Sequence, residues 1–416
     1  MALKDRLKDN RTIVLKCTEK EYRQFMDDPA CARQMIDRAY ERHPELFPSE
    51  MKRGYKFNGK TRFSRKLKLQ MRKIWVAGIT YQIRPCYVLS YMRGLADEVE
   101  KPLFLLRFGV PFWALAYVFG RNAMYWYRLF IRLSSYSLVG TTIHTATHLV
   151  YDLVADEYHL HIKGKLCYVA TTCANGCILG VEAVKSVCAD ALEKGYGVFK
   201  EEARMLDPLY KPKTVNTDGW QATQNAWRAL FAHIFIIECF LHAYIKVRDR
   251  ATKALGPLFQ SAADKIWHIY NAETKRAMGQ RLRRLYEWTC EQLADGPMKE
   301  NIIKLYHKRK RWLAHLDFPS AYRTSNMLDR LMKFMDRHAI AAQSFHSTLE
   351  STTKNYRAFA LLVNFTPSSP MITKRCPEFI SPAARLNGFV YHHNWLQNLL
   401  IAASLGGYRQ HSNPLQ

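Results

Sequence analysis

The spacing of apolar residues changes along this chain and divides it into segments of different character. Up to about residue 143, apolar positions recur every three to four residues, as over residues 19–45, which is typical of amphipathic helices. From His148 the spacing changes to every second residue, which indicates β-strands. Residues 244–318 return to the helical spacing. The pattern therefore predicts a mostly helical N-terminal region, an α/β core and a helical segment.

The alternating segment predicts a three-stranded antiparallel meander over residues 149–184. Lys163-Gly164-Lys165 is the turn between its first and second strands. Asn175-Gly176, between the second and third strands, is a strong signal for a two-residue hairpin. Three strands joined by short turns are therefore expected before the next helix.

The elements that follow alternate between helix and strand. We predict a helix over about residues 187–206, a strand that ends at Asp218, a helix from Gln221 and a strand over 233–239. This order, three antiparallel strands and then helix, strand, helix, strand and helix, resembles that of the ribonuclease H-like fold. In that fold the first and fourth strands lie side by side, which would place Asp156 next to Asp218.

Two carboxylates at neighbouring strands define a candidate metal site. Their charges disfavour joint ionisation, and a divalent cation relieves the repulsion. Oxygen ligands with open positions favour Mg²⁺ or Mn²⁺, and two such ions can stabilise both the attacking and the leaving oxygen of a phosphodiester. Alternatives remain: Asp152 shares the strand face of Asp156, Glu157 points to the opposite face, and Asp218 could simply cap the next helix.

With these residues the chain resembles DDE-type transposases of the ribonuclease H-like superfamily. The similarity is to the Mutator-like and bacterial insertion-sequence members, which carry a helical insertion before the last carboxylate. Asp156 and Asp218 at strand ends are the first point of similarity. Cys239 and His242 match the Cys-x-x-His signature of insertion-bearing members, and Thr324-Ser325-Asn326-Met327-Leu328-Asp329 is similar to the motif that opens the last catalytic helix. Cys239 and His242 cannot complete a zinc site, so we interpret them as support near the catalytic site.

The resemblance implies a catalytic and metal-binding triad of Asp156, Asp218 and Asp329, which would hold two Mg²⁺ or Mn²⁺ ions. The family usually has Glu at the third position. Asp329 departs from that pattern but keeps the usual distance from Asn326 along the chain. Glu350 is the alternative third carboxylate.

Residues 101–133 predict three short helices joined by glycine-containing turns. Gly109 ends the first helix, Pro111 suits the first turn of the second, and Gly120 separates the second from the third. This is the helix-turn-helix layout, in which the last helix enters the DNA major groove. Because the third helix is rich in aromatic residues, plain helical packing is the alternative. The candidate DNA contacts are Arg121, Asn122, Tyr125 and Arg128.

The net charge is +26, and more than half of it lies in the first 143 residues. Such a field attracts polyanions, nucleic acid first and an anionic membrane surface second. Residues 51–73 contain Lys and Arg at many positions, no acidic residue, and three interleaved aromatic residues. They form either a solvated basic face or a segment that tracks phosphates. The candidate DNA contacts there are Lys52, Arg53, Arg65 and Lys66.

Other sequence features narrow the class of protein. No run of 18 apolar residues occurs, so we expect no transmembrane span and no membrane partner. The first residues lack the apolar core of a signal peptide. The ten cysteines include no Cys-x-x-Cys pair, which argues against a zinc ribbon and favours reduced thiols in a bacterial cytosol.

The predicted fold class is an α/β core with a ribonuclease H-like, mixed five-stranded sheet, an all-α insertion and a mostly α-helical N-terminal DNA-binding region. The predicted organisation runs in chain order. It comprises a basic DNA-binding region at 1–143 with the helix-turn-helix at 101–133, the first part of the core at 144–243, the helical insertion at 244–318, the last core helices at 319–366 and a tail at 367–416.

The predicted function is that of a bacterial or archaeal DNA transposase, cytoplasmic and associated with the nucleoid. It would bind the terminal inverted repeats of double-stranded DNA, cleave phosphodiester bonds at the element ends and transfer the strands to target DNA. The resemblance implies a homodimer or a higher oligomer. Two alternatives remain: a catalytically inactive, transposase-derived DNA-binding protein or repressor, and a structure-specific nuclease.

Overall fold

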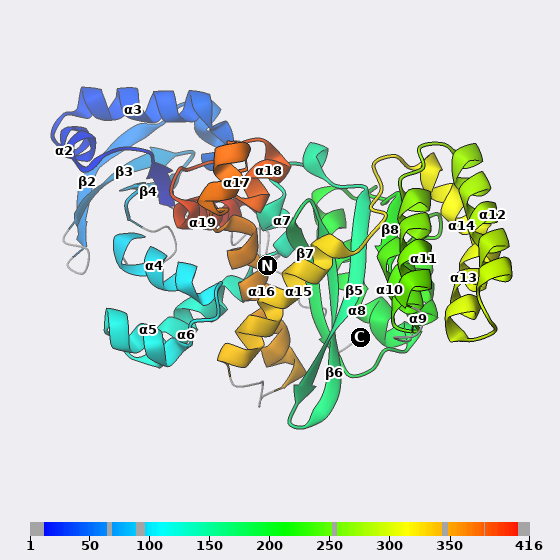
Figure 1. Cartoon of the computed structure of the whole chain (residues 1–416). Helices are drawn as coiled ribbons and strands as arrows, with labels where there is room; N and C mark the ends of the chain where they lie inside the picture. Colours follow the sequence, from blue (N-terminus) through cyan, green and yellow to red (C-terminus); the bar gives the residue numbers. More distant parts are fainter. Residues whose placement is uncertain are drawn as a thin grey trace.

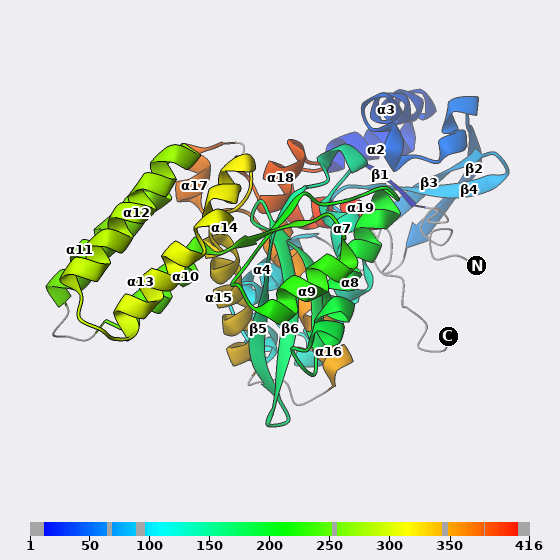
Figure 2. The same cartoon turned by 90° about the vertical axis from the view of Figure 1, so that its right-hand side faces the viewer.

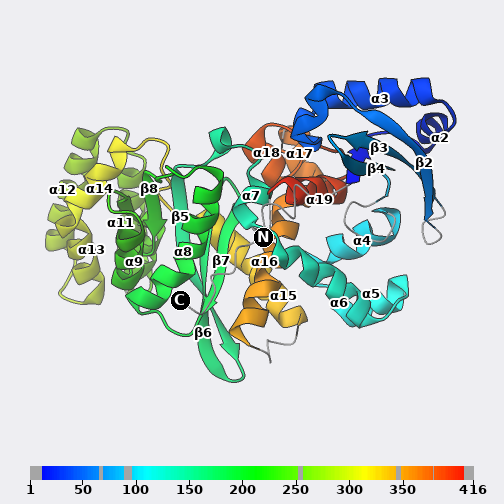
Figure 3. The same ribbon diagram turned by 180° about the vertical axis from the view of Figure 1, so that it is seen from behind.

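The computed structural model describes residues 12–64, 69–88, 96–251, 256–342, 348–377 and 379–406. Two mixed β-sheets and the helices around them make an α/β protein (Figure 1). The larger sheet lies in the middle of the molecule, with the smaller sheet at one end and the helices α10 to α14 at the other (Figures 1 and 3). No described helix is long and apolar enough to cross a lipid bilayer.

The five-stranded sheet has the order β7-β6-β5-β8-β9. The predicted meander is confirmed: β5 pairs antiparallel with β6, and β6 with β7, around a hairpin in which Asn175 and Gly176 both have positive φ. The predicted neighbour relation of the first and fourth strands is also confirmed, because β5 pairs in parallel with β8. The strands are β5 (Asp152–Ile162), β6 (Lys165–Ala174), β7 (Cys177–Val184), β8 (Thr214–Thr217) and β9 (Phe235–Glu238).

Helices cover both faces of this sheet, which explains why its strands are apolar at successive positions. Leu153 and Ala155 face a core formed with α8 (Ala189–Leu206) and α9 (Gln221–Leu230). Val154, between them, faces a second core formed with α15 (Asn326–Ala341), α16 (Leu349–Phe365) and α19 (Trp395–Gly406). Because side chains alternate along a strand, Asp156 shares the face of Val154 and Glu157 the face of Ala155.

Residues 240–314 form helices with a core of their own, built around Phe240, Ile266, Leu282 and Trp312. They follow β9 and precede α15 in the chain, and their long helices stand beside the β9 edge of the sheet (Figure 2). The helical spacing of this segment is therefore confirmed. The helices are α10 (Phe240–Arg248), α11 (Gly256–Tyr270), α12 (Lys275–Gln292), α13 (Pro297–His307) and α14 (Arg309–Ala314).

The helices expected over residues 19–45 are present, but the prediction of a mostly helical N-terminal region is wrong for residues 56–85, which contain three strands. Two helices lie on a four-stranded sheet of order β1-β4-β3-β2, in which β1 pairs in parallel with β4. The strands were missed because Lys and Arg occupy many of their polar positions, and because the β2–β3 register shifts between Phe57 and Thr61, which breaks the alternation. The elements are β1 (Thr12–Leu15), α2 (Glu19–Asp27), α3 (Pro29–Arg42), β2 (Lys56–Ser64), β3 (Leu69–Val76) and β4 (Ile79–Pro85).

The three helices expected within residues 101–133 are present as α4 (Ala96–Leu106), α5 (Phe112–Phe119) and α6 (Ala123–Ile131). Their buried residues belong to the same core as α15, α16 and α19, whereas residues 13–83 form a separate core. The helical segment is thus attached to the larger sheet, and the small sheet packs as a unit of its own.

The short helices α17 (Pro370–Arg375) and α18 (Pro382–Asn387) precede α19.

Candidate functional site

The parallel pairing of β5 with β8 positions two aspartates. Val154 is in register with Asn216, and each strand direction leads, two residues later, to an aspartate: Asp156 on β5 and Asp218 just after β8. Burial, followed by the negative charges of Glu157 and Asp218, raises the pKa of Asp156 to about 7. The two carboxylates therefore lie close enough to repel each other.

Backbone amides hold both carboxylates in place. Asp156 Oδ1 accepts a hydrogen bond from the Glu157 amide at 2.8 Å, and Asp218 Oδ1 accepts one from the Trp220 amide at 2.8 Å. Gly219, between Asp218 and Trp220, has φ +94°, a conformation that favours glycine. Asp218 thus stabilises the turn into α9, while the N-cap position of that helix belongs to Trp220.

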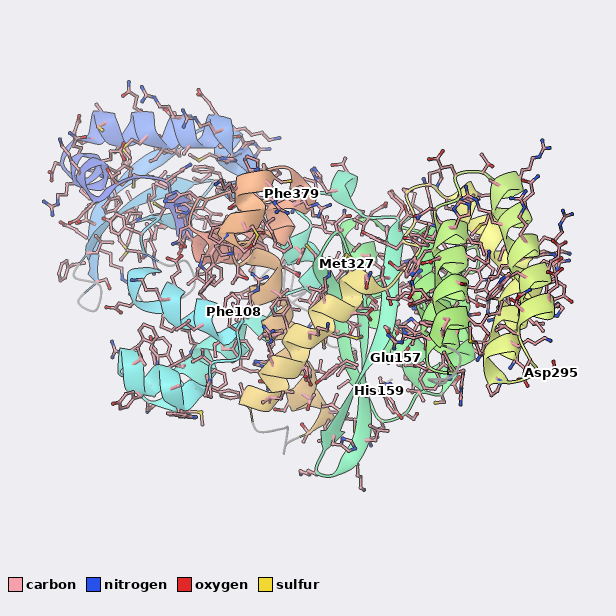
Figure 4. The ribbon with its side chains drawn as sticks, in the orientation of Figure 1. Phe108, Glu157, His159, Asp295, Met327 and Phe379 are labelled. Atoms are coloured by element: carbon pink, nitrogen blue, oxygen red, sulfur yellow. The ribbon has the colours of Figure 1, made fainter. Side chains whose placement is uncertain are left out.

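The competing acids of β5 have other partners. Glu157 lies in the middle of the molecule (Figure 4), and its Oε1 accepts hydrogen bonds from Tyr196 of α8 and Thr223 of α9, each at 2.7 Å. Asp152 accepts a hydrogen bond from the Thr214 hydroxyl at 2.7 Å. Glu157 therefore faces the α8–α9 layer, as the strand alternation predicted, and Asp152, on the same face as Asp156, is hydrogen-bonded to β8.

Cys239 and His242 lie at the start of α10, directly after β9. Their mutual hydrogen bond raises the pKa of His242 to about 9, although burial opposes the shift, and the negative charges of Asp156 and Asp218 add to it. The same pairing lowers the pKa of the Cys239 thiol against the effect of burial. A positively charged imidazole therefore lies within electrostatic reach of both strand-end aspartates.

Asp329 lies in the first turn of α15. The Ser325 hydroxyl donates to Asp329 Oδ2 at 3.2 Å, and the Ser325 amide donates to Cys239 Sγ at 3.2 Å, which ties this turn to the start of α10. Burial raises the pKa of the Cys173 thiol of β6, and the charges of Cys177, Asp156 and Asp329 raise it further. Asp156 and Asp329 therefore both lie near Cys173.

The three aspartates do not meet around one point. Within the described ranges, no three His, Cys, Asp or Glu side chains are grouped closely enough to hold a metal ion. Glu350, the alternative third carboxylate, lies in the first turn of α16, is largely exposed and pairs with Lys354 at 2.6 Å. Helix α16 packs against β7, two strands away from β5.

Glu238 is an acidic residue of this region that the sequence interpretation missed. It is buried at the end of β9, in register with Thr217, and its carboxylate lies 3.7 Å from where a side chain at Gly219 would begin. It forms ion pairs with Lys308, at 2.6 Å, and with Arg311, which lower its pKa although burial opposes them. The sequence contained a signal for it: Glu238 lies at the end of the strand predicted over residues 233–239, in the same way that Asp218 ends the strand predicted before it.

The candidate DNA contacts on α6 divide into two kinds. Asn122 is the N-cap of α6, where its Oδ1 accepts from the Tyr125 amide at 2.7 Å, so it has a structural role. Arg121 and Arg128 are exposed, and the Arg121 guanidinium lies 5.5 Å from the centre of the Tyr125 ring. In the basic segment, Lys52 and Arg53 are exposed beside Gly54. Arg65 and Lys66 lie outside the described residues.

In comparisons with known proteins, no family model and no curated sequence matched this chain.

Proposed function

We propose that this chain is a DNA transposase of the DDE/D type, which cleaves phosphodiester bonds at element ends and transfers the strands. The observation that carries the proposal is the β5–β8 parallel pair, which sets Asp156 and Asp218 at adjacent strand ends. The strand order, with three antiparallel strands followed by two parallel ones, supports a ribonuclease H-like core. The helices between β9 and α15 support the insertion-bearing branch.

Asp156 and Asp218 offer the kind of ligand that a hard divalent cation prefers, although a third ligand is not grouped with them among the described residues. Both supply carboxylate oxygens. Burial, and after it the negative charges of Glu157 and Asp218, raise the pKa of Asp156, and a cation would offset these effects. Asp156, Asp218 and Asp329 would hold Mg²⁺ or Mn²⁺, two ions in the proposed enzyme. When bound, such ions activate water and stabilise the charge of the phosphodiester that is being cleaved.

The surrounding side chains position the site and the DNA. Ser325 orients Asp329, and the turn at Gly219 fixes Asp218. Glu238 holds Lys308 and Arg311 beside this turn, and both keep about half of their side-chain surface exposed. These two cations and the His242 imidazolium would attract a DNA phosphate toward the aspartates.

The remaining parts of the proposal concern partners. The net charge of +26 and the exposed Arg121 and Arg128 support binding of double-stranded DNA by the α4–α6 segment, at the terminal repeats of the element. A homodimer or higher oligomer, acting in a bacterial or archaeal cytoplasm close to the nucleoid, completes the proposed setting.

The test is strand cleavage by isosteric variants. Asp156→Asn and Asp218→Asn should each lower Mg²⁺-dependent cleavage of a duplex that carries the element end by about 10³-fold or more, because a neutral amide binds the metal poorly. Binding of the same duplex should persist. Asp152→Asn, four residues earlier on β5, is the control and should cleave nearly as well as the parent chain. Retained cleavage by either triad variant would contradict the proposal.

A catalytically inactive DNA-binding protein or repressor is the second candidate function. It is favoured by the short Asp329 side chain and by the lack, within the described part of the chain, of a ready group of three ligands. An Mg²⁺-dependent nicking assay separates the two, since a repressor would bind the ends and leave them intact. Cleavage without joined products from pre-cleaved ends would indicate a structure-specific nuclease instead.

A further inference from the structure

The helices of the N-terminal unit cover one face of its sheet, while on the other face Met71 is buried and Trp75 is exposed. Ile74 of β3 and Ile83 of β4 are fully buried in the core that α2 and α3 complete. The register places Trp75 opposite Lys56 on one side and Thr80 on the other, all on the face directed away from these helices. This second face is called the outer face below.

The outer face is basic and carries an exposed indole. Arg62 and Lys73 share it with Lys56 and Trp75, according to the strand register. Trp75 is 47% exposed, whereas its neighbours Ile74 and Val76 are 0% and 1% exposed. Between Glu50 and Asp97 the chain contains no acidic residue, so no negative side chain of these strands offsets the cations. A tryptophan half exposed among cations is an unusual use of a large apolar surface.

We propose that the outer face, defined by Lys56, Arg62, Lys73 and Trp75, binds a single strand of DNA. A sheet face that combines an exposed ring with cations matches the way unpaired strands are held, with a base stacked on the ring and phosphates on the cations. A duplex keeps its bases stacked within itself and offers such a surface only phosphates, which leaves Trp75 without a role. The inference rests on the proposed function in taking DNA as the partner.

The position of the outer face agrees with this role. The small sheet and the helices α4 to α6 lie at the same end of the molecule, away from helices α10 to α14 (Figures 1 and 3). Duplex recognition by α6 would therefore deliver DNA to the end of the molecule where the sheet lies. Cleavage at an element end frees strand termini, which supply unpaired nucleotides for the sheet.

The experiment measures the fluorescence anisotropy of a labelled 20-nucleotide oligothymidylate and of a 20-base-pair duplex, using the full chain. Trp75→Ala should weaken binding of the single strand about tenfold, because the stacking contact is lost, and should change duplex binding less than threefold. Trp75→Phe keeps an aromatic ring and should restore most of the single-strand affinity.

The charges are tested by a matched pair of double variants. Lys56→Glu with Lys73→Glu should weaken single-strand binding more than tenfold and make it less dependent on salt. Lys20→Glu with Arg38→Glu changes the net charge equally, but these exposed residues lie on α2 and α3, on the covered side of the same sheet. This control should bind the oligonucleotide as the parent chain does. Unchanged melting temperatures establish that each variant is folded.

Three results would overturn the inference. Single-strand binding by folded Trp75→Ala equal to that of the parent chain is the first. Equal losses for the single strand and the duplex would make the face a duplex surface. Loss of self-association in Trp75→Ala, without loss of oligonucleotide binding, would make it a contact between two copies. Asp156→Asn separates this inference from the proposed function, because that variant should keep single-strand binding whether or not the parent chain cleaves DNA.

Discussion

The two sheets of this protein use charge in opposite ways. The five-stranded sheet is covered on both faces, and its charges are acidic, largely buried and partnered, as with Glu157 between Tyr196 and Thr223. The four-stranded sheet is covered by its own helices on one face and displays cations such as Lys56 and Arg62 to solvent. Buried acids near a strand end suit metal-assisted chemistry, and exposed cations suit the holding of a polyanion.

This difference predicts whether a substitution of a charged residue changes mainly the stability of the fold or mainly the binding of a partner. A buried charge is stabilised by specific partners, so its removal leaves them unpaired inside the protein. An exposed charge is solvated whether or not it has a partner, so its removal changes binding more than folding. The predictions that follow compare residues of the two kinds.

The largest effect is expected at Asp329. Asp329→Ala should reduce Mg²⁺-dependent nicking of an end-containing duplex by about 10³-fold, whereas Glu350→Ala should stay within about threefold of the parent chain. The reason is position: Asp329 is tied through Ser325 to the start of α10, and Glu350 is exposed and paired with Lys354. The opposite ranking of the two variants in a gel-based nicking assay would make Glu350 the third carboxylate.

The second prediction concerns a buried ion pair behind the large sheet. Arg357 donates to Glu202 at 2.6 Å and to the Tyr136 carbonyl, and the side chains of Arg357 and Glu202 are 1% and 3% exposed. Arg357→Met should lower the free energy of unfolding by about 3–5 kcal/mol, since the buried Glu202 charge loses its cation and keeps only the hydrogen bonds from Ser137 and Val139.

Arg62→Met on the outer face is the matched control for this pair, because it removes the same guanidinium from an exposed site. It should change the stability by less than about 0.5 kcal/mol in urea unfolding. Similar costs at Arg357 and Arg62 would break the comparison between the two sheets. Adding Glu202→Gln to Arg357→Met should recover part of the loss, because the unpaired charge is then removed.

A third prediction uses pH. His338 of α15 is buried, stacks on Phe359 at 4.6 Å between ring centres, and burial lowers its pKa to about 4. The unfolded chain, with an ordinary histidine pKa, binds the proton first as the pH falls below about 6.5. The stability that depends on neutral His338 is therefore present above pH 6.5 and is lost toward pH 4, by roughly 3 kcal/mol.

Melting temperatures measured from pH 4 to pH 7 test this prediction. His338→Leu should be less sensitive to acid than the parent chain over this range. His161→Leu, which replaces an exposed histidine of β5, should keep the full sensitivity to acid. If both variants respond to pH as the parent chain does, acid lability has its origin elsewhere, for example in the buried histidines His315 and His392, whose pKa values burial also lowers.

The parts that were predictable from the sequence are those coded locally. The hairpin at Asn175-Gly176 follows from two residues that adopt positive φ, and the turns at Gly109 and Gly120 separate helices α4 to α6 as expected. The neighbour relation of β5 and β8 came from the order of elements in a fold that the chain resembles. Placing Asp156 beside Asp218 required that fold and did not follow from spacing alone.

The parts that were missed depend on contacts between distant residues. Strand β1 pairs with β4 in parallel across about 70 residues, and nothing in Thr12–Leu15 identifies that partner. The Glu202–Arg357 pair joins positions 155 residues apart, and either charge, seen alone, predicts an exposed side chain. Whether Asp329 reaches the other two aspartates also depends on how α15 packs, which no local pattern fixes.

The smallest effect is expected at two exposed ion pairs, one beside each sheet. They test whether the stability lost with a charge depends on its solvent exposure or on the sheet that it lies beside. Glu19–Arg23 on α2 and Glu350–Lys354 on α16 are both i,i+4 pairs at 2.6 Å with exposed carboxylates, one beside each sheet. Glu19→Gln and Glu350→Gln should each change the free energy of unfolding by less than about 0.5 kcal/mol, because solvent screens both pairs and their side-chain entropy offsets the attraction. Urea unfolding in low and high salt measures this. A loss of more than about 1 kcal/mol for Glu350→Gln alone would mean that the position beside the larger sheet, and not solvent exposure, determines the change in the free energy of unfolding.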